Sequence, residues 1–506
     1  MSLGKEEKPY TTSIAIAVAG SVDSGKSSFI GVLISNELDD GNGLARSLVA
    51  NHPHEIETGR TSSISTKICK FETQNGKKSA ITFIDLCGHE KYFKSTSFGI
   101  TGYFPDYAFV IVSANRGILP MTKQHLRLLI SFNIPFMFII THIDLAPPEI
   151  YQMTCDSITK VCKSYIGKLA NTKFINTYKD YEIFIDQEHK EEISNIEKPE
   201  KISNILDNLC NTIDGRQLVY PVLTISNTNG FYIDVMKSLI AQIPQRAFWN
   251  TTADTNVLNN KVIKHFKLHI NPTILPAHQK FDGTIFYIDS GYNPPGIGIV
   301  STGIARGKSI NTGDIMWLGP FGKEFIEVRI KSMHNNARQL VNTLEDHNRG
   351  CIAFAPKKND ITKDKLNKGM IMISPYSLIK NICFHFKACI MVYNNSVTMK
   401  SNYSPVIHMN NIKQSARMII EGTEKVLSTG NVETVIFKFK SKPEYIEPYN
   451  IFVFTSGDVH GCGMIIEPIS LEIDPDGKPD PIKLKRFSKR KEKRMEIVKE
   501  RLLKFN

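Results

Sequence analysis

A glycine-rich segment near the N-terminus carries the residue types needed to bind phosphate. Residues 20–27 read Gly-Ser-Val-Asp-Ser-Gly-Lys-Ser and match the pattern GxxxxGK[ST]. An apolar run at 12–19 precedes them and the helix-like FIGVLISN follows, so the segment connects a strand to a helix. Glycines let backbone N–H groups face the phosphates, Lys26 reaches the β- and γ-phosphates, and the Ser27 hydroxyl suits Mg²⁺. A glycine turn without a ligand does not explain the lysine.

A second polar motif follows the apolar run ITFI. Residues 85–88 (Asp-Leu-Cys-Gly) resemble the DxxG motif of GTPases, in which the aspartate holds Mg²⁺ through water and the glycine N–H senses the γ-phosphate. His89 comes next, where its side chain could reach an attacking water or could merely cap the following helix. The predicted phosphate-binding residues are Gly20, Ser21, Val22, Asp23, Ser24, Gly25, Lys26, Ser27, Ser28 and Gly88.

A third motif indicates which base is bound. Residues 141–144 (Thr-His-Ile-Asp) end another apolar run and resemble the guanine-reading [NT]KxD motif. A carboxylate here accepts two hydrogen bonds from the guanine N1–H and N2–H₂ pair, which adenine cannot supply. A further loop that supports the base is expected at the end of VLTISN. The predicted guanine-binding residues are Thr141, His142, Asp144, Ser226 and Asn227.

The elements around these motifs predict an α/β domain. Apolar, β-rich runs at 12–19, 81–86, 107–114 and 136–145 are separated by segments long enough for helical crossovers. Continuous apolar strands separated by helices predict a parallel sheet covered on both faces. Ligands of such sheets lie at the C-terminal ends of the strands, where the polar motifs are.

The rest of the chain changes character three times. Residues 170–215 are polar and charged, which favours a surface insertion rather than a core element. Residues 244–260 are typical of a linker. From about 260, short alternating segments such as FKLHINPTIL and GTIFYID are separated by Gly, Pro and Asn, and a similar block covers about 378–471. Two small β-barrels or sandwiches are expected.

Length and composition agree with a folded multidomain protein. A chain of 506 residues predicts two to four domains. Its nine cysteines are scattered and form no CxxC pair, which favours reduced thiols over zinc or dithiol chemistry. The N-terminus is charged where a signal peptide is apolar, and no run approaches the ~20 apolar residues of a membrane span. We expect a soluble, cytoplasmic monomer with no membrane partner.

Positive charge gathers at the C-terminus. Residues 483–506 contain 11 Lys/Arg and 3 Asp/Glu, so they contribute +8 of the formal net charge of +12. Such a segment suits RNA, because neutralising each phosphate releases counterions. It would equally serve as a nuclear address or as a solvated helix that aids solubility. Apolar residues recur in it at helical spacing, so part of it could dock on a protein surface.

The motifs together resemble those of the translational GTPases. GSVDSGKSS, ETGRTSS and FIDLCGHEKYFKSTSFGITGYFPDY are similar to the phosphate loop, switch I and switch II of elongation factors, and ARGKSINTGD and HMNNIKQSARM to segments of their β-domains. The resemblance is greatest to the eukaryotic GTP-binding protein 1/2 group, related to elongation factors 1-alpha and Tu, and it covers the chain to about 471. It implies a P-loop GTPase domain at 10–246, β-barrels at 260–376 and 377–472, and a basic helical tail at 473–506.

The resemblance also implies roles for single residues. Thr61 would be the switch I threonine that contacts Mg²⁺ and the γ-phosphate in the GTP state, so the implied Mg²⁺ ligands are Ser27, Thr61 and, through water, Asp85. Thr61 and His89 would be catalytic, with His89 positioning the attacking water.

Three positions need separate comment. Arg60 replaces the isoleucine usual in elongation factors, and it could reach the transferring phosphoryl group in cis or contact ribosomal RNA. His142 replaces the lysine whose stem covers one face of the base, and an imidazole could stack there instead. Asp23 matches the elongation factors and could hold a monovalent cation or be structural.

Two functions are expected from this family. The first is a GTP-hydrolysing translation factor that brings aminoacyl-tRNA or a related RNA to the ribosome. The second is a regulatory GTPase that binds RNA or RNA-processing machinery without delivering tRNA. An ATP-using metabolic enzyme is disfavoured, because Asp144 indicates guanine.

Overall fold

The computed structural model describes the chain between residues 12 and 469. Gaps in this range fall at 59–60, 73–77, 167–169, 187–198, 211–216, 218, 246–282, 323, 358–365, 368, 395–398, 421–425, 429–431, 449 and 457–458. Arg60, most of the predicted linker, the expected strand FKLHINPTIL and the basic tail therefore lie outside the described residues.

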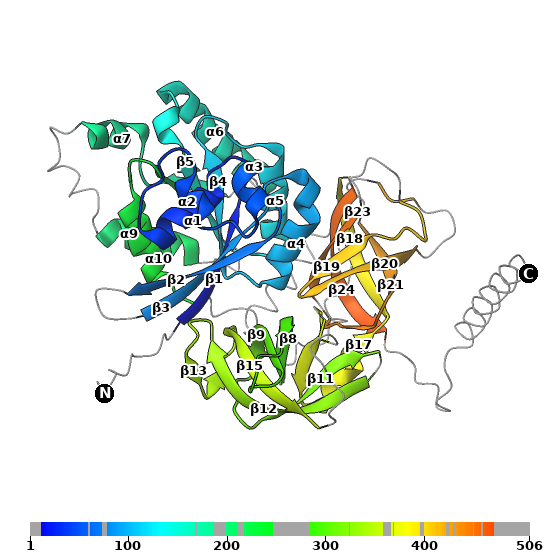
Figure 1. The fold of residues 1–506 in the computed structure, drawn as a ribbon. Helices are drawn as coiled ribbons and strands as arrows, with labels where there is room; N and C mark the ends of the chain where they lie inside the picture. The colour runs from blue at the N-terminus through cyan, green and yellow to red at the C-terminus, as the bar shows by residue number, and fades with distance from the viewer. Residues whose placement is uncertain are drawn as a thin grey trace, which may run out of the picture.

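The N-terminal domain contains a seven-stranded sheet in the order β2-β3-β1-β4-β5-β7-β6 (Figure 1). All its pairings are parallel except that of β2 with β3. The strands are β1 (Thr12–Ala19), β2 (Ser65–Glu72), β3 (Lys78–Asp85), β4 (Tyr107–Ser113), β5 (Phe136–Thr141), β6 (Asn171–Phe174) and β7 (Val219–Thr224). Every residue of β4 and β5 is buried, because their continuous apolar sequences pack on both faces of the sheet. The predicted α/β domain is confirmed.

Helices follow most of these strands and flank the sheet (Figure 1). They are α1 (Lys26–Ser35), α2 (Leu44–Ser47), α3 (Pro53–Thr58), α4 (Phe93–Gly102), α5 (Pro120–Ser131), α6 (Pro148–Tyr165), α7 (Tyr178–Ile185), α9 (Pro199–Cys210) and α10 (Ile233–Gln242), with 3₁₀ turns η1 (Glu90–Tyr92) and η2 (Ile143–Leu145). Among the helices of the described residues, none is long and apolar enough to cross a membrane.

The expectation that 170–215 is only a surface insertion is wrong for its described parts. Strand β6 pairs with β7 at the edge of the sheet. Helix α9 places Ile202, Ile205 and Leu209 in the core, the last two fully buried. These residues recur at helical spacing among charged ones, so average composition hides the apolar face.

Two closed β-barrels follow, as expected. The first runs β11-β16-β8-β9-β15-β12 and closes through β11 with β12; its strands are β8 (Thr284–Tyr292), β9 (Val300–Gly307), β11 (Ile315–Phe321), β12 (Glu324–Asn335), β15 (Arg349–Pro356) and β16 (Ile371–Ser374). Short strands β10 (Ile310–Asn311), β13 (Leu340–Val341) and β14 (Thr343–Leu344) lie at its margin, and η6 (Tyr376–Asn381) leads to the next domain.

The second barrel runs β18-β21-β20-β19-β23-β24. Its strands are β18 (His385–Asn394), β19 (Val406–Met409), β20 (Ile412–Ile420), β21 (Val432–Phe439), β23 (Ile451–Ser456) and β24 (Val459–Ile469), and β17 (Ile382–Cys383) pairs with β22 (Glu444–Tyr445) beside it. Buried and more exposed residues alternate along β20, as they must when one face lines a barrel interior. All nine cysteines of the chain lie in described segments and none forms a disulfide.

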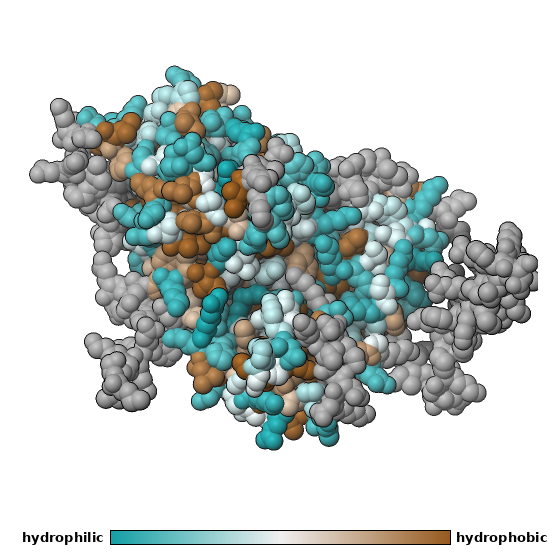
Figure 2. All heavy atoms as spheres, viewed as in Figure 1, coloured by the Kyte–Doolittle hydropathy of each residue, from teal (hydrophilic) through white to brown (hydrophobic). Residues whose placement is uncertain are grey.

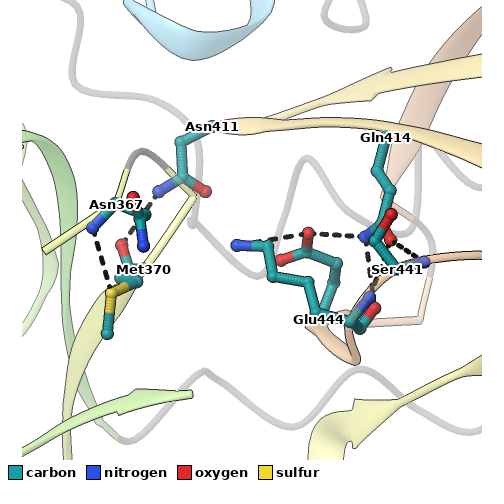
Figure 3. A network of polar contacts seen from close by, with 7 residues as sticks. Asn367, Met370, Asn411, Gln414, Ser441 and Glu444 are labelled. Carbon is teal, nitrogen blue, oxygen red and sulfur yellow. Dashed lines mark hydrogen bonds and ion pairs between the residues drawn. The ribbon is translucent and has the colours of Figure 1, made fainter. Parts of the chain in front are cut away.

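The three domains touch one another (Figure 1). After α4, the carbonyl of Tyr103 accepts a hydrogen bond from Arg349 of the first barrel at 3.0 Å, and Arg306 stacks over Phe104 at 5.3 Å. Between the barrels, the amide of Asn411 donates to the Met370 carbonyl at 3.1 Å (Figure 3). The end of α4 therefore rests directly on the first barrel.

A buried polar cluster supports the same junction from the second barrel. Gln414 donates to the Glu444 carboxylate at 2.8 Å and accepts from the backbone N–H of Ser441 at 2.7 Å (Figure 3). Burial raises the pKa of Glu444 to about 7, although Lys442 lies 3.5 Å away. Oε2 of Glu444 has no hydrogen-bond partner among the described residues, so the cluster is only partly satisfied.

Candidate nucleotide site

An open cleft of about 250 Å³ lies where the polar motifs meet. Segments far apart in the sequence form its walls, including the phosphate loop, switch I, the turn after β3 and the turn after β5. Of the predicted residues, those that line it are Val22, Asp23, Gly25, Lys26, Ser27, Ser28, Thr61, Gly88, His89 and His142. Asp85 lines a smaller adjoining pocket, together with Ser27 and Thr61.

The phosphate loop is shaped by its contacts with the sheet and with α5. Gly20 has φ +141°, and a Cβ there would lie 2.4 Å from the Ile111 carbonyl oxygen, so only glycine fits. The Gly20 N–H donates to Nδ1 of His125 at 3.0 Å, and the hydroxyls of Ser21 and Thr122 lie 2.7 Å apart. Burial lowers the pKa of His125 to about 3, which keeps its ring neutral and able to accept.

Lys26 is held at the floor of the cleft. Its Nζ donates to the Ser21 carbonyl at 2.7 Å, and its side chain is buried. Burial lowers the pKa of Lys26, while the nearby Asp85 opposes that shift. A Cβ on Gly88 would lie 2.6 Å from the Lys26 Nζ, so the glycine of the DxxG motif admits the ammonium group beside it.

Three oxygen-bearing side chains converge beside Lys26. The Ser27 hydroxyl donates to Oδ2 of Asp85 at 2.6 Å, and the Thr61 hydroxyl lies 3.1 Å from that of Ser27. Burial raises the pKa of Asp85, although Lys26 and the two hydroxyls oppose the shift. Oδ1 of Asp85 is buried and has no hydrogen-bond partner in the described part of the chain. Two hydroxyls and a buried carboxylate with an oxygen to spare fit the oxygen ligands that Mg²⁺ prefers.

A carboxylate that the sequence did not single out organises the approach to Thr61. Oε1 of Glu55 accepts from the N–H and hydroxyl of Ser62 at 2.7 and 2.9 Å and from the N–H of Ser63 at 3.2 Å. Its Oε2 accepts from the N–H groups of Asn51 and His52 at 2.9 and 3.3 Å. Burial alone would raise the pKa of Glu55, but these hydrogen bonds lower it to about 2. Glu55 thus connects residues 51–52, before Thr61, to residues 62–63, after it.

His89 is half-buried at the mouth of the cleft. Its Nδ1 accepts from the backbone N–H of Lys91 at 3.2 Å, and its ring packs edge-on against Tyr92 with centroids 6.1 Å apart. The histidine therefore does cap η1, and it also lines the cleft. Capping and a role at the site are compatible, because Nε2 remains for other contacts.

Asp144 lies at the other end of the site, in η2. Its Oδ1 accepts from the Ser226 hydroxyl at 2.9 Å and its Oδ2 accepts from the Thr228 hydroxyl at 3.2 Å. The structure thus brings Asp144 and Ser226 together, and it adds Thr228. Asn227 is buried beside them, and its Oδ1 has no hydrogen-bond partner among the described residues.

Thr141 and His142 connect this end to the phosphate loop. The Thr141 hydroxyl donates to the Ser24 carbonyl at 2.8 Å. His142 has φ +57°, its Nδ1 is 2.9 Å from the Ser113 hydroxyl, and a Cβ on Gly25 would lie 3.2 Å from its ring. Burial lowers the pKa of His142, which favours the neutral ring. The imidazole thus covers the phosphate loop where the related motif has a lysine stem.

Asp23 stands at the rim with φ +56° and forms an exposed ion pair with Arg116 at 3.2 Å. The monovalent-cation role therefore stays a prediction. Sequence reasoning missed several residues that shape the site, and these are Arg46, Glu55, Thr122, His125 and Thr228. None of them belongs to a motif, and only the folded chain brings them to the cleft.

The chain is similar to known proteins over most of its length. Residues 11–247 match the model of the elongation factor Tu GTP binding domain. The chain is 30% identical over 474 residues to GTP-binding protein 1 of Xenopus laevis, covering 89% of this chain and 63% of that protein. It is 28% identical over 471 residues to GTP-binding protein 2 of Homo sapiens, covering 90% of this chain and 69% of that protein.

Solved structures share the fold at lower sequence identity. A bacterial selenocysteine-specific elongation factor EF-Sec matches with a TM-score of 0.57 and 16% identity, over 90% of this chain and 59% of that one. Elongation factor SelB of Methanococcus maripaludis with the GTP analogue GppNHp matches with a TM-score of 0.55 and 17% identity, over 90% of this chain and 80% of that one. Residues 11–247 therefore form an elongation factor Tu-type GTP binding domain, and the chain is similar to GTP-binding proteins 1 and 2 over most of its length.

Proposed function

We propose that this protein binds and hydrolyses GTP as a translation-factor-like switch that acts on tRNA and the ribosome. One observation carries the proposal: Lys26, Ser27 and Thr61 line the same cleft as His142, Asp85 accepts a hydrogen bond from Ser27 beside it, and His142 comes two residues before Asp144 in the base-reading motif. This spacing of phosphate-binding and base-reading groups suits a guanine nucleotide.

The residues near Asp85 would hold Mg²⁺ in the loaded site. Ser27 and Thr61 would be direct ligands, and Asp85 would contact the ion through water. When bound, Mg²⁺ neutralises charge on the β- and γ-phosphates. Lys26 and the N–H groups of the phosphate loop would bind the same phosphates from the protein side.

His89 would orient the attacking water rather than remove its proton. Because Nδ1 accepts a hydrogen bond from the Lys91 N–H, the neutral imidazole carries its hydrogen on Nε2. That nitrogen then donates to the water oxygen and leaves a water proton to pass to phosphate or solvent. Loss of the γ-phosphate would release Thr61 and Gly88, so switch I and α4 would change their contacts with the barrels.

The catalytic role is tested by His89→Ala in a GTP hydrolysis assay with and without ribosomes. We expect stimulated hydrolysis to be lost while GTP affinity stays within roughly threefold, as for a residue that acts in the transition state. His334→Ala, on the exposed surface of the first barrel, is the matched control. Unchanged stimulated hydrolysis in the His89 variant would exclude the proposed role.

A regulatory GTPase that binds RNA without delivering tRNA is the second candidate. It is favoured by the similar proteins, whose names state GTP binding and no step of translation. Filter binding of charged and uncharged tRNA to the GTP form separates the two functions, since only a delivery factor prefers charged tRNA. Ribosome co-sedimentation with and without residues 483–506 tests whether the basic tail contacts RNA.

A further inference from the structure

Arg46 lies at the phosphate end of the cleft, although no motif contains it. It lines the cleft together with Lys26, Thr61 and His89. It also lines the small adjoining pocket, together with Ser27 and Asp85. Arg46 is thus a boundary residue between the cleft and the group of oxygen ligands described above.

The short helix that carries Arg46 buries Ala45 in the core and leaves its flanking leucines exposed. Leu44 and Leu48 are 52% and 50% exposed, whereas the half-buried Arg46 lines the cleft. Figure 2 shows apolar atoms gathered on the surface over α1 and α2. A guanidinium on the wall of the cleft is placed where it could meet an anionic ligand.

The position of Arg46 is fixed by close packing of α2 on α1. A Cβ on Gly31 of α1 would lie 2.0 Å from the Ala45 carbonyl oxygen, so the two helices touch through their backbones. The N–H of Ala45 donates to Asp39 at 2.9 Å, and the N–H of Asp39 donates to the Asn227 carbonyl at 2.8 Å. Arg46 is therefore positioned relative to both ends of the site before any ligand binds.

A glycine makes room for the guanidinium group. Gly43 has φ +97°, and a Cβ there would lie 2.6 Å from a terminal nitrogen of Arg46. The side chain thus folds back over its own loop, along the wall of the cleft. A residue with a side chain at position 43 would both strain the backbone and displace the guanidinium.

The charge of Arg46 is not neutralised by the protein around it. Within the described residues, its guanidinium forms no ion pair or hydrogen bond. Of the two carboxylates of the adjoining pocket, Glu55 accepts from Asn51, His52, Ser62 and Ser63. Asp85 accepts from Ser27 through Oδ2, and its Oδ1 faces no donor among the described residues. An anion in the cleft would supply the missing partner.

We propose that Arg46 donates hydrogen bonds to the phosphates of bound GTP and stabilises the charge that develops as the γ-phosphoryl group is transferred. This inference rests on the proposed GTPase function. In that reaction the water oxygen bonds to the γ-phosphorus, the bond to the β–γ bridging oxygen breaks, and the products are GDP and phosphate. A planar guanidinium can contact two phosphate oxygens at once, so it suits this role better than an ammonium group.

The test measures single-turnover GTP hydrolysis, binding of fluorescent GDP and GTP, and capture of GDP with aluminium fluoride, which mimics the transferring phosphoryl group. The proteins are the full chain, Arg46→Ala and Arg46→Lys, with Arg127→Ala as the control; Arg127 stacks on Tyr165 away from the cleft. We expect Arg46→Ala to slow hydrolysis by about tenfold or more and to lose aluminium fluoride capture, with GDP affinity within about threefold. Arg46→Lys should recover only part of the rate.

Two results would overturn the inference. Hydrolysis and capture equal to wild type would show that Arg46 does not contact the phosphates, and an equal loss of GDP and GTP affinity would assign it a structural role. Arg60→Ala is measured in parallel. If only this variant hydrolyses GTP slowly, Arg60 and not Arg46 is the arginine that stabilises the transferring phosphoryl group. Failure of the proposed function is distinguishable, because wild-type protein would then show no GTP hydrolysis.

Discussion

The phosphate loop and switch I meet at the same cleft but are held by different forces. The loop at 20–28 is set by core contacts, namely the Ile111 carbonyl against Gly20 and the buried His125 beneath it. The part of switch I on either side of Thr61 is held mainly by the Glu55 carboxylate, which accepts backbone N–H groups of Asn51, His52, Ser62 and Ser63. Packing in a core opens only with the domain, whereas hydrogen bonds near the surface open locally. The loop is therefore a permanent part of the fold, and switch I is the part that a nucleotide can order or release.

The largest effect on nucleotide affinity is expected from a substitution in the phosphate loop. Lys26→Ala removes the ammonium group from the cleft floor, and a hydrogen bond to a charged group contributes about 1.5–3 kcal/mol, so affinity for GTP should fall by about 100-fold. GDP affinity should fall as well, since the β-phosphate loses the same contact. Isothermal titration of both nucleotides measures this, with far-UV circular dichroism to confirm folding. Selective loss of GTP affinity alone would contradict a nucleotide-independent loop.

A smaller and more selective effect is expected from loosening switch I. Glu55→Ala removes the acceptor for five hydrogen bonds on both sides of Thr61. Since Thr61 is predicted to contact the nucleotide only in the GTP state, the preference for GTP over GDP should fall by about tenfold while GDP affinity is kept. In Glu55→Gln the preference for GTP should fall less, because the amide oxygen can still accept hydrogen bonds.

Fluorescent nucleotide competition measures that ratio. Glu37→Ala, which removes an exposed carboxylate after α1, is the control. Equal weakening of GTP and GDP would mean that Glu55 supports the whole domain rather than the switch.

The smallest expected effect is on stability at acid pH. The contribution of His125, under the phosphate loop, should be lost at a higher pH than that of Glu55 in switch I. Burial lowers the pKa of His125 from 6.5 to about 3, so the unfolded chain takes up a proton that the native ring refuses. Stability from this group is present above pH 6.5 and is lost as pH falls toward 3. The pKa of Glu55 is lowered from 4.5 to about 2, so its contribution is lost only below pH 4.5.

Urea unfolding at pH 7, 5.5 and 4.5 measures the difference. His125→Gln, which can still accept a hydrogen bond but does not titrate, should lose less stability than wild type between pH 6.5 and 4.5. His52→Gln, at an exposed position, should follow wild type. A His125→Gln profile parallel to that of wild type would mean that the buried ring does not control this window.

The strands that the sequence predicts are those that are buried on both faces, because their residues are apolar at every position. The runs that became β4 and β5 are apolar at every position because both faces of the sheet are covered. The edge strands β2 and β6 were not singled out, and β6 lies in a segment whose charge favoured a surface insertion. Edge strands bury one face or less, so their composition differs little from that of a loop.

The same distinction applies to the site. Gly20, Lys26, Asp85 and Asp144 could be assigned from the sequence because the backbone and ligand chemistry of these motifs admit few other residues at such spacing. Their surroundings were decided by tertiary structure. His125 supports Gly20 from 105 residues away in the chain, and Thr228 reaches Asp144 from 84 residues away. No local pattern encodes such contacts, because each depends on which helix and strand pack side by side; Arg46 likewise became a candidate ligand only when α2 packed against α1 and turned its charge toward the cleft.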